Sequence, residues 1–449
     1  MIIINWNGIE HLNDCFTSLL ACEYPHVRFV LVDNGSTDGS VEYVRREFGV
    51  DPRVEIVELG ENLGWSPGNN AGIERALEAD ADYIFLLNND TWTAPDAVGK
   101  LVEFADANPN AGAIAPKMLM FYQPDLLNSV GVTCSMVGVG WDEGLGRVDT
   151  PAWNMSKPVL GVCGGAMFLR SSSLRKTGLL PTDFEIYLDD LDLSLRMWSA
   201  GYEVWSCPEA VVRHKFSATM GEGERAKRKY YLNTRNRLRL ILRNFPASKS
   251  AAIAAAYIMS ECKALGRALL NGEGWRIKAH VRSWFDALAY LGKAAKARKA
   301  LRATGFNPMR FWPMVQKRQL FFPGTEFPEE GWYAPRTLKG VFRVRPMTQR
   351  ATLAVEGGPL RILLTNCYPR VAEAHVRVAQ NDCQLAHLST SSLEEVVIET
   401  RPGTLEFYAE RLFTAEETGE QIDIGGWIAV EPLRADTHPP EARLPNESV

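Results

Sequence analysis

The stretch RFVLVDNGSTDGS, residues 28–40, decides the fold class of this chain. Its apolar part is typical of a β-strand ending at Asp33, and the polar turn that follows brings Asp38 to a helix N-cap position. Four more apolar runs alternate with helical stretches, namely IIIN at 2–5, VEIVEL at 54–59, DYIFLLNND at 82–90 and GAIAPKML at 112–119. This alternation predicts an α/β fold, in which a parallel sheet is covered by helices.

The composition is that of a soluble globular protein. The 449 residues are 46% hydrophobic and 23% charged, and a chain of this length suggests about two or three domains. The net charge of -5 argues against a general nucleic-acid binder, so we expect no nucleic-acid partner. Eight cysteines without a CxxC pair indicate scattered reduced thiols.

The amino terminus, MIIINWNG, has neither the basic region nor the long apolar stretch of a signal peptide. No later run approaches the roughly 20 apolar residues of a membrane span. We therefore expect a cytoplasmic protein. Because Met1 is followed at once by Ile2–Ile4, the first strand looks shortened, which is compatible with a start further upstream.

Four parts follow one another along the chain. Residues 1–245 are expected to form the α/β domain, and 246–322 a basic helical segment. Within the latter, residues 249–320 hold 14 Lys or Arg and three acidic residues, a local charge of +11. Short alternating strands over 323–435 predict an antiparallel β-sandwich. The Pro- and Glu-rich tail 436–449 is expected to be disordered.

Polar clusters stand where three of the predicted strands end, at Asn5–Gly8, Asp33–Ser36 and Asn88–Asp90. In open parallel sheets, ligands bind beyond the carboxyl ends of the strands, so these clusters should converge on one crevice. A carboxylate such as Asp33 can accept hydrogen bonds from a base or a ribose. The alternative is that Asp33 only caps its own turn.

The segment ENLGWSPGNNAGIERAL, residues 61–77, places a Gly- and Asn-rich loop before a helix that begins near Pro67. Unpaired backbone N–H groups at such a helix start could face a phosphate. Asn and Gly are also common in ordinary loops, and the strict GxGxxG pattern is absent. The candidate nucleotide-sugar ligands in this half of the chain are Asn5, Asp33, Asn62, Gly64, Asn69 and Asn88.

A divalent metal site is predicted at Asp90, because the apolar strand before it delivers its carboxylate to the sheet edge. Mg²⁺ or Mn²⁺ would bridge from there to a diphosphate and neutralise the charge that grows on a departing nucleoside diphosphate. His214, after the β-like run EAVVR, could give a nitrogen ligand to the same metal. Alternatively, Asp90 caps a helix near Pro95 and His214 is structural.

Three carboxylates, Asp189, Asp190 and Asp192, crowd the predicted start of a helix. Their repulsion is partly offset by the helix dipole, and a carboxylate in this position can take a proton from an attacking hydroxyl. We take Asp190 as the general base and Asp189 as its neighbour or alternate. Asp192 stands four residues before Arg196 and is more simply half of a helix-surface ion pair.

The tract RKYYLNTRNRLRLILRN, residues 228–244, sets several cations on one helix. The guanidinium of Arg235 could hold phosphate oxygens of the donor. The spacing of Leu and Ile fits an amphipathic core helix with solvated arginines equally well.

In this order, the segments IIINWNG, VDNGSTDGS, ENLGWSPGNNAGI, LLNNDT, GGAMFLR, YLDDLDLSLR, GYEVW, PEAVVRH and YYLNTRNR resemble glycosyltransferase family 2, which has the GT-A fold. The likeness covers about residues 1–245 and is closest to bacterial rhamnosyltransferase-like members. It implies a metal-dependent, inverting enzyme. The donor would be a dTDP- or UDP-sugar, with L-rhamnose as a candidate sugar, and the acceptor a growing cell-surface glycan or a lipid-linked molecule.

The resemblance also implies roles for single residues. Asp33 would contact the nucleoside, Asp90 would bind the metal and the diphosphate, and Asp190 would be the general base. His214 matches a metal-ligand position of the family. The sequence departs from the family pattern at Asn88, where an acid begins the metal motif, and at Asp189, where Glu is common.

The last third of the chain carries two further hypotheses. Trp275, Trp284 and Phe285 stand among Lys and Arg residues, so the helical segment could rest on an anionic bilayer, at the inner face of the plasma membrane. A solvated helical hairpin is the alternative. The strands of 323–435 resemble carbohydrate-binding jelly-roll modules in their pattern.

Two other functions stay open at this stage. The α/β domain could bind a nucleotide sugar or a glycan without catalysis, although such a protein would not need Asp190 as a base. A nucleotidyltransferase would share the sheet and the metal, but it should carry a Gly- and Lys/Arg-rich loop after its first strand. Residues 5–8 do not supply one.

Overall fold

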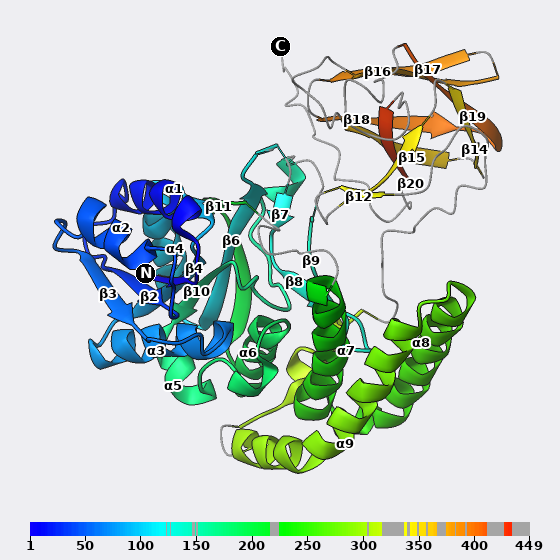
Figure 1. The fold of residues 1–449 in the computed structure, drawn as a ribbon. Coiled ribbons are helices and arrows are strands. Elements are labelled where there is room, and N and C mark those ends of the chain that lie inside the picture. The colour runs from blue at the N-terminus through cyan, green and yellow to red at the C-terminus, as the bar shows by residue number, and fades with distance from the viewer. Residues whose placement is uncertain are drawn as a thin grey trace, which may run out of the picture. The chain divides into compact units, whose positions relative to one another are not determined.

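The computed structural model divides the chain into two compact units, Met1–Gln319 and Leu320–Val449 (Figure 1). The predicted tail 436–449 lies outside the described residues, and the predicted boundaries near 245 and 322 remain predictions. The structure describes residues 1–122, 124–125, 127–145, 149, 151–215, 224–302, 305–316, 336–338, 342–347, 350–355, 358–365, 374–381, 383–390, 393–410 and 426–432.

The first unit is built on a mixed sheet in the order β3-β2-β1-β4-β10-β6-β11-β5, with β7 beside β6. Strands β3, β2, β1 and β4 are parallel, as predicted, and β6 is parallel to β11. The strands are β1 (Ile2–Asn5), β2 (Phe29–Asp33), β3 (Val54–Glu58), β4 (Tyr83–Asn88), β5 (Thr91–Thr93), β6 (Ala111–Met120), β7 (Leu127–Ser129), β10 (Ala166–Arg170) and β11 (Glu203–His214), and a separate hairpin joins β8 (Val132–Cys134) to β9 (Gly140–Asp142).

The expectation of a wholly parallel sheet is wrong beyond β4. Strand β10, from the GGAMFLR segment, runs antiparallel between β4 and β6. The run at 112–119 therefore joins the sheet through a strand that comes about 50 residues later in the sequence. The place of β10 in the sheet is set by pairing with strands distant in the sequence. The local alternation of strands and helices does not reveal such pairing.

Alternating residues of the parallel strands feed two cores. Ile3, Leu31 and Phe85 belong to one buried cluster, and their neighbours Ile2 and Val32 to the other. This is the period-2 pattern of a sheet that is covered on both faces. The helices of this part are α1 (Ile9–Leu20), α2 (Ser40–Glu47), α3 (Trp65–Glu78), α4 (Ala97–Ala107), α5 (Ser171–Thr177) and α6 (Asp189–Ala200), with short 3₁₀ turns at Pro151–Trp153 and Thr182–Phe184.

Two glycines let α3 lie unusually close to the sheet. A Cβ atom added at Gly68 would stand 2.5 Å from Cδ1 of Ile4, and one added at Gly72 would stand 2.5 Å from Cγ2 of Ile2. Because the two glycines are four residues apart, both face the sheet. The approach fixes the start of α3, and thus Trp65 and Ser66, relative to the strand ends.

A helical part completes the first unit, with α7 (Glu224–Asn244), α8 (Ser250–Leu270) and α9 (Gly274–Arg302) and short 3₁₀ turns at Ala247–Lys249, Pro308–Arg310 and Trp312–Met314. Helix α7 packs along α9, which pairs with α8 (Figure 1). Leu195 of α6, Leu240 of α7 and Ile253 of α8 share one buried cluster, so these helices continue the core of the α/β part. Among the helices that the structure describes, none combines the length and hydrophobicity needed to cross a bilayer.

The second unit contains two antiparallel sheets, in the orders β12-β13-β20-β15-β18 and β14-β19-β16-β17. These two sheets confirm the predicted antiparallel β class. Their inner residues include Ile362, Leu364, Val378 and Phe407, which are fully buried. The strands are β12 (Arg336–Leu338), β13 (Phe342–Met347), β14 (Arg350–Val355), β15 (Gly358–Thr365), β16 (Ala374–Gln380), β17 (Cys383–Thr390), β18 (Leu393–Thr400), β19 (Gly403–Ala409) and β20 (Gly426–Pro432).

Candidate active site

The polar clusters at the ends of β1, β2 and β4 meet at one edge of the sheet. Nδ2 of Asn5 donates to Oδ1 of Asp33 (3.0 Å), and Oδ1 of Asn5 accepts from Nδ2 of Asn89 (2.6 Å). Asn5 thus links the other two strand ends. The second carboxylate oxygen of Asp33 accepts from the backbone N–H of Ser36 (2.9 Å). Asp33 therefore caps its own turn. Its predicted contact with a nucleoside stays a prediction.

The loop before α3 is joined to this edge through Asn34, a residue that sequence reasoning did not single out. Nδ2 of Asn34 donates to Oδ1 of Asn62 (3.0 Å) and to the carbonyl of Gly64 (3.1 Å). Asn69 donates from within α3 to the carbonyl of Trp65 (2.9 Å). Gly64 has a φ of 96°, which favours glycine. The signal for Asn34 was its position directly after the strand-end Asp33.

Trp65 connects this loop with the end of β4. Its Nε1 donates to Oδ1 of Asn88 (3.1 Å), and its ring lies 3.1 Å from where a Cβ of Gly164 would stand. Asn88 also donates its backbone N–H to the carbonyl of Gly165 (3.1 Å). The Gly164–Gly165 pair, just before β10, is therefore set into the middle of the site.

The two predicted metal ligands lie side by side. Nε2 of His214 is 3.1 Å from Oδ1 of Asp90, because Thr91 of β5 pairs with His214 of β11. Nδ1 of His214 contacts Oδ1 of Asn128 (2.8 Å), and this contact orients the ring. An imidazole nitrogen and a carboxylate oxygen are both of types that bind divalent cations, so this pair could hold such a cation.

The charged forms of Asp90 and His214 stabilise each other. Burial disfavours the charged form of both groups, but the carboxylate of Asp90 outweighs that cost and raises the pKa of His214. In the same way, the imidazolium outweighs burial and lowers the pKa of Asp90. A cation bound between them would replace the proton of the imidazole.

The predicted base lies at the start of α6, with its carboxylate held by backbone groups. Oδ2 of Asp190 accepts from the N–H of Gly164 (2.8 Å), and Oδ1 accepts from that of Leu191 (2.7 Å). Oδ2 of Asp189 accepts from the hydroxyl of Ser66 (2.5 Å). Burial raises the pKa of both aspartates, and for Asp190 the charge of Asp189 adds to the effect. Such a carboxylate can take up a proton nearer neutral pH than an ordinary aspartate.

The glycine pair brings the predicted base and the predicted metal ligands close together. Gly164 binds Asp190 through its N–H, and a Cβ at the adjacent Gly165 would lie 3.3 Å from Cε1 of His214. A fourth carboxylate, Asp142 of β9, is close enough to raise the pKa of Asp190 further. Burial raises the pKa of Asp142 itself. Asp142 stands in a Gly-rich segment without a recognisable pattern, so nothing in the sequence marked it.

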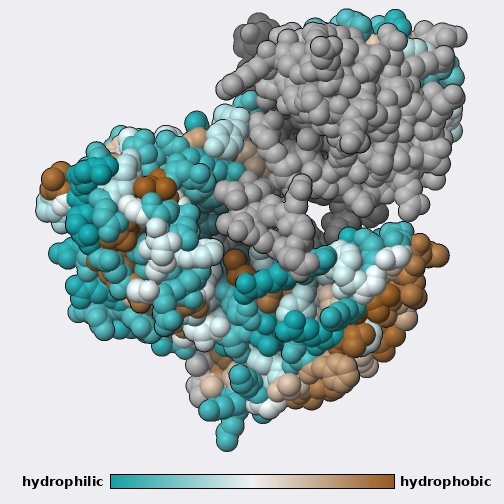
Figure 2. All heavy atoms as spheres, viewed as in Figure 1, coloured by the Kyte–Doolittle hydropathy of each residue, from teal (hydrophilic) through white to brown (hydrophobic). Residues whose placement is uncertain are grey.

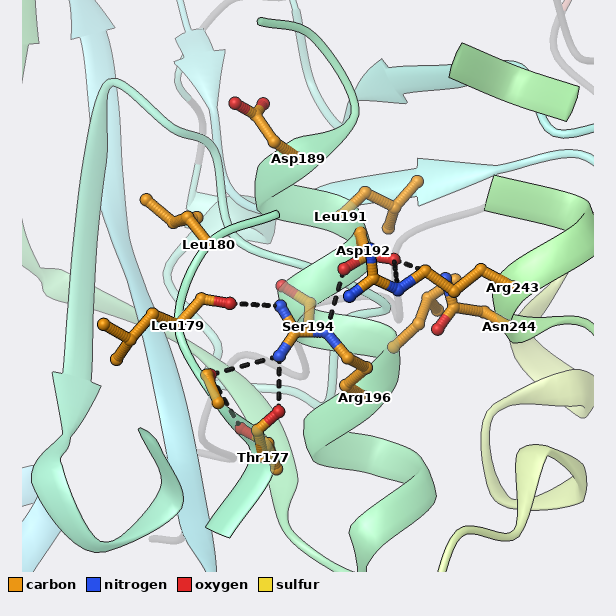
Figure 3. A network of polar contacts seen from close by, with 12 residues as sticks. Thr177, Leu179, Leu180, Asp189, Leu191, Asp192, Ser194, Arg196, Arg243 and Asn244 are labelled. Carbon is orange, nitrogen blue, oxygen red and sulfur yellow. Dashed lines mark hydrogen bonds and ion pairs between the residues drawn. The ribbon is translucent and has the colours of Figure 1, made fainter. Parts of the chain in front are cut away.

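Asp192 does pair with Arg196, but the expectation of a surface pair is wrong (Figure 3). The two side chains are 0% and 2% exposed and lie 2.8 Å apart. The guanidinium also donates to the carbonyls of Thr177 (2.6 Å) and Leu179 (2.7 Å). The reason is that α6 is covered on one side by the sheet and on the other by α7, so it has no fully solvated face at this position.

Arg235 reaches the loop that precedes Asp189 and Asp190. Its Nη1 donates to Oε1 of Glu185 (2.6 Å) and its Nη2 to the carbonyl of Phe184 (2.9 Å). These contacts engage the guanidinium with the protein itself, and its predicted contact with phosphate stays a prediction. The core-helix alternative also describes α7, whose Leu240 is fully buried.

The same loop has a costly backbone conformation. Glu185, Tyr187 and Leu188 have φ values of 68°, 74° and 65°, and each non-glycine residue in this region costs roughly 1–3 kcal/mol. Nδ2 of the buried Asn236 donates to the carbonyls of Phe184 (2.9 Å), Ile186 (2.9 Å) and Tyr187 (3.0 Å). Asn236 therefore holds in place the turn that aims Asp189 and Asp190, although sequence reasoning gave it no role.

Asn236→Asp is expected to lower stability by roughly 1–3 kcal/mol, because a carboxylate cannot donate to carbonyls and leaves them unsatisfied. Turnover should fall with it, since the loop also positions the base. Thermal unfolding and single-turnover transfer rates would measure the two effects. Asn233→Asp is the control, because Asn233 donates to the carbonyl of Lys229 on its own helix (3.0 Å) and not to the loop of Asp189. Equal behaviour of the two variants would remove the role assigned to Asn236.

The amino-terminal part of this chain matches a known protein family. Residues 1–174 match the family model described as glycosyl transferase family 2. Residues 1–174 of this chain are therefore identified as a glycosyl transferase family 2 domain. The matched part of the family 2 domain includes Asp33 and Asp90 and stops before Asp189, and the ordered segments quoted above extend the likeness to His214.

Proteins similar to this part of the chain include two named bacterial enzymes. N-acetylglucosaminyl-diphospho-decaprenol L-rhamnosyltransferase of Mycobacterium tuberculosis is 27% identical over 246 residues, which cover 49% of this chain and 76% of the relative. Poly-beta-1,6-N-acetyl-D-glucosamine synthase of Staphylococcus epidermidis is 23% identical over 216 residues, which cover 48% of this chain and 49% of the relative. The first half of this chain is thus similar to bacterial glycosyltransferases, among them an L-rhamnosyltransferase.

Solved structures similar to this chain include that of S. aureus TarS 1-349 in complex with UDP-GlcNAc. The TM-score is 0.45 at 14% sequence identity, and the similarity covers 69% of this chain and 88% of TarS. A mannosyltransferase from Pyrobaculum calidifontis in complex with GDP-Man and Mn²⁺ has a TM-score of 0.40 at 16% identity, with 70% and 86% covered.

Proposed function

We propose that the protein transfers a sugar, with L-rhamnose as the first candidate, from a dTDP- or UDP-sugar to a hydroxyl of a growing cell-surface glycan or lipid-linked acceptor. The observation that carries the proposal is the meeting of three kinds of group at one sheet edge. Asn5 and Asp33 are suited to a nucleoside, Asp90 and His214 to a metal, and Asp190 to a proton.

The Asp90–His214 pair would hold Mn²⁺ or Mg²⁺. The two donor atoms are close together and buried, and both are of types that bind divalent cations. When bound, the cation would neutralise the charge that develops on the leaving nucleoside diphosphate. Asn128 keeps the ring of His214 oriented for this role through its contact with Nδ1.

Asp190 would act on the acceptor. Its carboxylate takes the proton of the acceptor hydroxyl while the oxygen forms a bond to the anomeric carbon and the bond from that carbon to the diphosphate breaks. One displacement from the opposite side inverts the configuration at the anomeric carbon. The raised pKa of Asp190 suits it to accept that proton, and Gly164 and Leu191 keep the carboxylate in place.

The acceptor side of the proposal draws on the relatives. The M. tuberculosis enzyme is named for a decaprenol diphosphate carrying N-acetylglucosamine, so an acceptor of this kind, bound to a lipid carrier, is a candidate here. A lipid carrier would require the protein to work in contact with the inner face of the plasma membrane.

The test is a panel of UDP-, dTDP- and GDP-sugars, with donor binding measured by calorimetry and donor hydrolysis by release of the nucleoside diphosphate. One donor should bind in the presence of Mn²⁺ or Mg²⁺, and binding should fall at least about 100-fold in EDTA or in Asp90→Asn, since a metal contributes several kcal/mol. Asp96→Asn, an exposed acid of the same domain, should bind normally.

Three other results would change the proposal. If no nucleotide sugar bound, the transferase function would be wrong. Binding without turnover for any acceptor would favour a non-catalytic nucleotide-sugar-binding protein. Metal-independent binding in both wild type and Asp90→Asn would remove the roles of Asp90 and His214 while leaving the rest intact.

A further inference from the structure

The outer side of the α8–α9 hairpin is covered by large exposed hydrophobic side chains. Leu270 is 88% exposed and Phe285 is 68% exposed. Figure 2 shows hydrophobic residues gathered along these two helices. A soluble surface usually shows such side chains singly, and a contiguous group marks a binding face. Those on the two helices are Ile258, Met259, Leu269, Leu270, Val281, Phe285, Leu288 and Leu291.

Helical spacing gathers these residues into one stripe on each helix. On α9, Val281, Phe285 and Leu288 follow each other at intervals of four and three, which keeps them on one side of the helix. On α8, Met259 and Leu270 are eleven residues apart, or about three turns. Between them the exposed Cys262 adds no charge. We call the exposed side chains of the two stripes the hairpin face.

Cations border the hairpin face. On α8, Lys263 and Arg267 are exposed next to the stripe, and on α9 the exposed cations are Lys278, Arg282, Lys293, Lys296 and Lys299. Over residues 250–302 there are ten Lys or Arg and three acidic residues, which leaves a net charge of +7.

The three acids point elsewhere. Glu261 is buried against Arg237 and His280, and Asp286 accepts a hydrogen bond from the hydroxyl of Tyr231. Glu273 pairs with Arg276 next to the turn between the helices.

The sequence had singled out three aromatic residues in this segment, and the structure separates them. Phe285 is exposed, whereas Trp284 donates to Glu261 (2.8 Å) from a partly buried position.

We propose that the hairpin face docks on the surface of an anionic lipid bilayer, with the apolar stripes among the headgroups and the cations facing lipid phosphates. A second copy of the chain is a weaker occupant, because a symmetric contact would set one strongly positive hairpin against another. An anionic bilayer can bury the apolar stripes and pair with the cations at the same time. The inference deepens the proposed function, because it names the surface by which a lipid-linked acceptor would be reached.

Flotation of the full-length protein with extruded vesicles tests this proposal. Vesicles of phosphatidylcholine with about one third phosphatidylglycerol should carry the protein at low salt. Pure phosphatidylcholine should carry much less, and high salt should release it. Lys296→Gln/Lys299→Gln should weaken binding to anionic vesicles by roughly 25-fold, and Phe285→Ser by roughly 10- to 100-fold.

Matched controls separate this surface from a general loss of charge or apolar area. Arg45→Gln/Arg46→Gln removes two exposed cations of α2, and Val50→Ser removes an apolar side chain that is 87% exposed. Both should float like the wild type. Donor hydrolysis in lipid-free buffer, measured in parallel, should be unchanged in all variants, so a failure of the proposed function would be seen there and not in flotation.

Three outcomes would overturn the inference. The first is no flotation with anionic vesicles at low salt. The second is equal flotation of the hairpin variants and their controls. The third is a dimer in light scattering that Phe285→Ser dissociates, since the hairpin face would then be covered by a second copy.

Discussion

Asp190→Asn should lower the rate of sugar transfer by roughly 10²- to 10⁴-fold, the range expected for loss of a general base. The amide has nearly the shape of the carboxylate and can still accept one of the two backbone hydrogen bonds from Gly164 and Leu191. Donor affinity should therefore stay close to that of the wild type. Calorimetric titration of the donor and a steady-state transfer assay would separate the two quantities.

The pH dependence of the wild type follows from the same carboxyl. Burial, and then the charge of Asp189, raise its pKa above the ordinary 3.8, so the base form is lost as the pH falls through a value well above 3.8. Turnover should decline on the acid side there, and the decline should be absent from the residual activity of Asp190→Asn. Because the folded protein holds this proton more tightly than the unfolded chain, ionisation of Asp190 costs stability as the pH rises through that range.

Asp96→Asn is the matched control, since Asp96 also lies at the start of a helix but is exposed and pairs with Lys100. A variant of Asp190 with near-normal turnover would pass the role of base to Asp189 or Asp142. Loss of donor affinity together with turnover would indicate a disturbed site rather than a missing base.

Asp192→Ala should destabilise the first unit by roughly 3–5 kcal/mol, the cost of leaving a buried cation without its partner. Asp192 is fully buried and faces Arg196 at 2.8 Å and Arg243 at 3.4 Å. Nδ2 of Asn244 also donates to it (2.7 Å). Figure 3 shows this network on the flank of α6, with Asp189 apart from it. Removal of the Asp192 carboxylate therefore tests packing between α6 and α7. The residues proposed to contact the donor are left unchanged.

The urea midpoint of the first unit, followed by tryptophan fluorescence, would measure the effect. Asp96→Ala offers a close control, because Asp96 and Lys100 form a solvent-accessible pair with the same four-residue spacing at the start of α4. Exposed pairs contribute about 0–1 kcal/mol. If both variants shifted the midpoint equally, the Asp192 network would be a surface-type interaction despite its burial.

Much of the sheet edge could be read from the sequence, because the carboxyl ends of parallel strands share one edge. That rule placed Asn5, Asp33 and Asn88 together before any contact was known. It could not place β10, whose partner β4 is about 80 residues away in the chain. The approach of His214 to Asp90 depends on the pairing of β5 with β11. It was predicted from the ligand chemistry of the imidazole and from the family resemblance, and no pattern in the sequence predicted the strand pairing.

The positioning residues were harder to foresee for a different reason. Asn236 acts on backbone carbonyls about 50 residues away, and a backbone carbonyl leaves no mark in the sequence. The burial of Asp192 depends on α7 covering α6. A four-residue spacing of opposite charges looks the same on a solvated helix and on one packed on two sides.

The paired glycines of α3 set a limit on how this domain can be engineered. Glycines inside a helix are the usual first targets for thermostabilisation, since Gly→Ala gains up to about 1 kcal/mol of helix propensity. At Gly68 and Gly72 the added methyl group would press on Ile4 and Ile2 at 2.5 Å and push the helix off the strands. Trp65 and Ser66, which begin this helix and bind Asn88 and Asp189, would move with it, so a consensus or propensity-guided library should leave both glycines fixed.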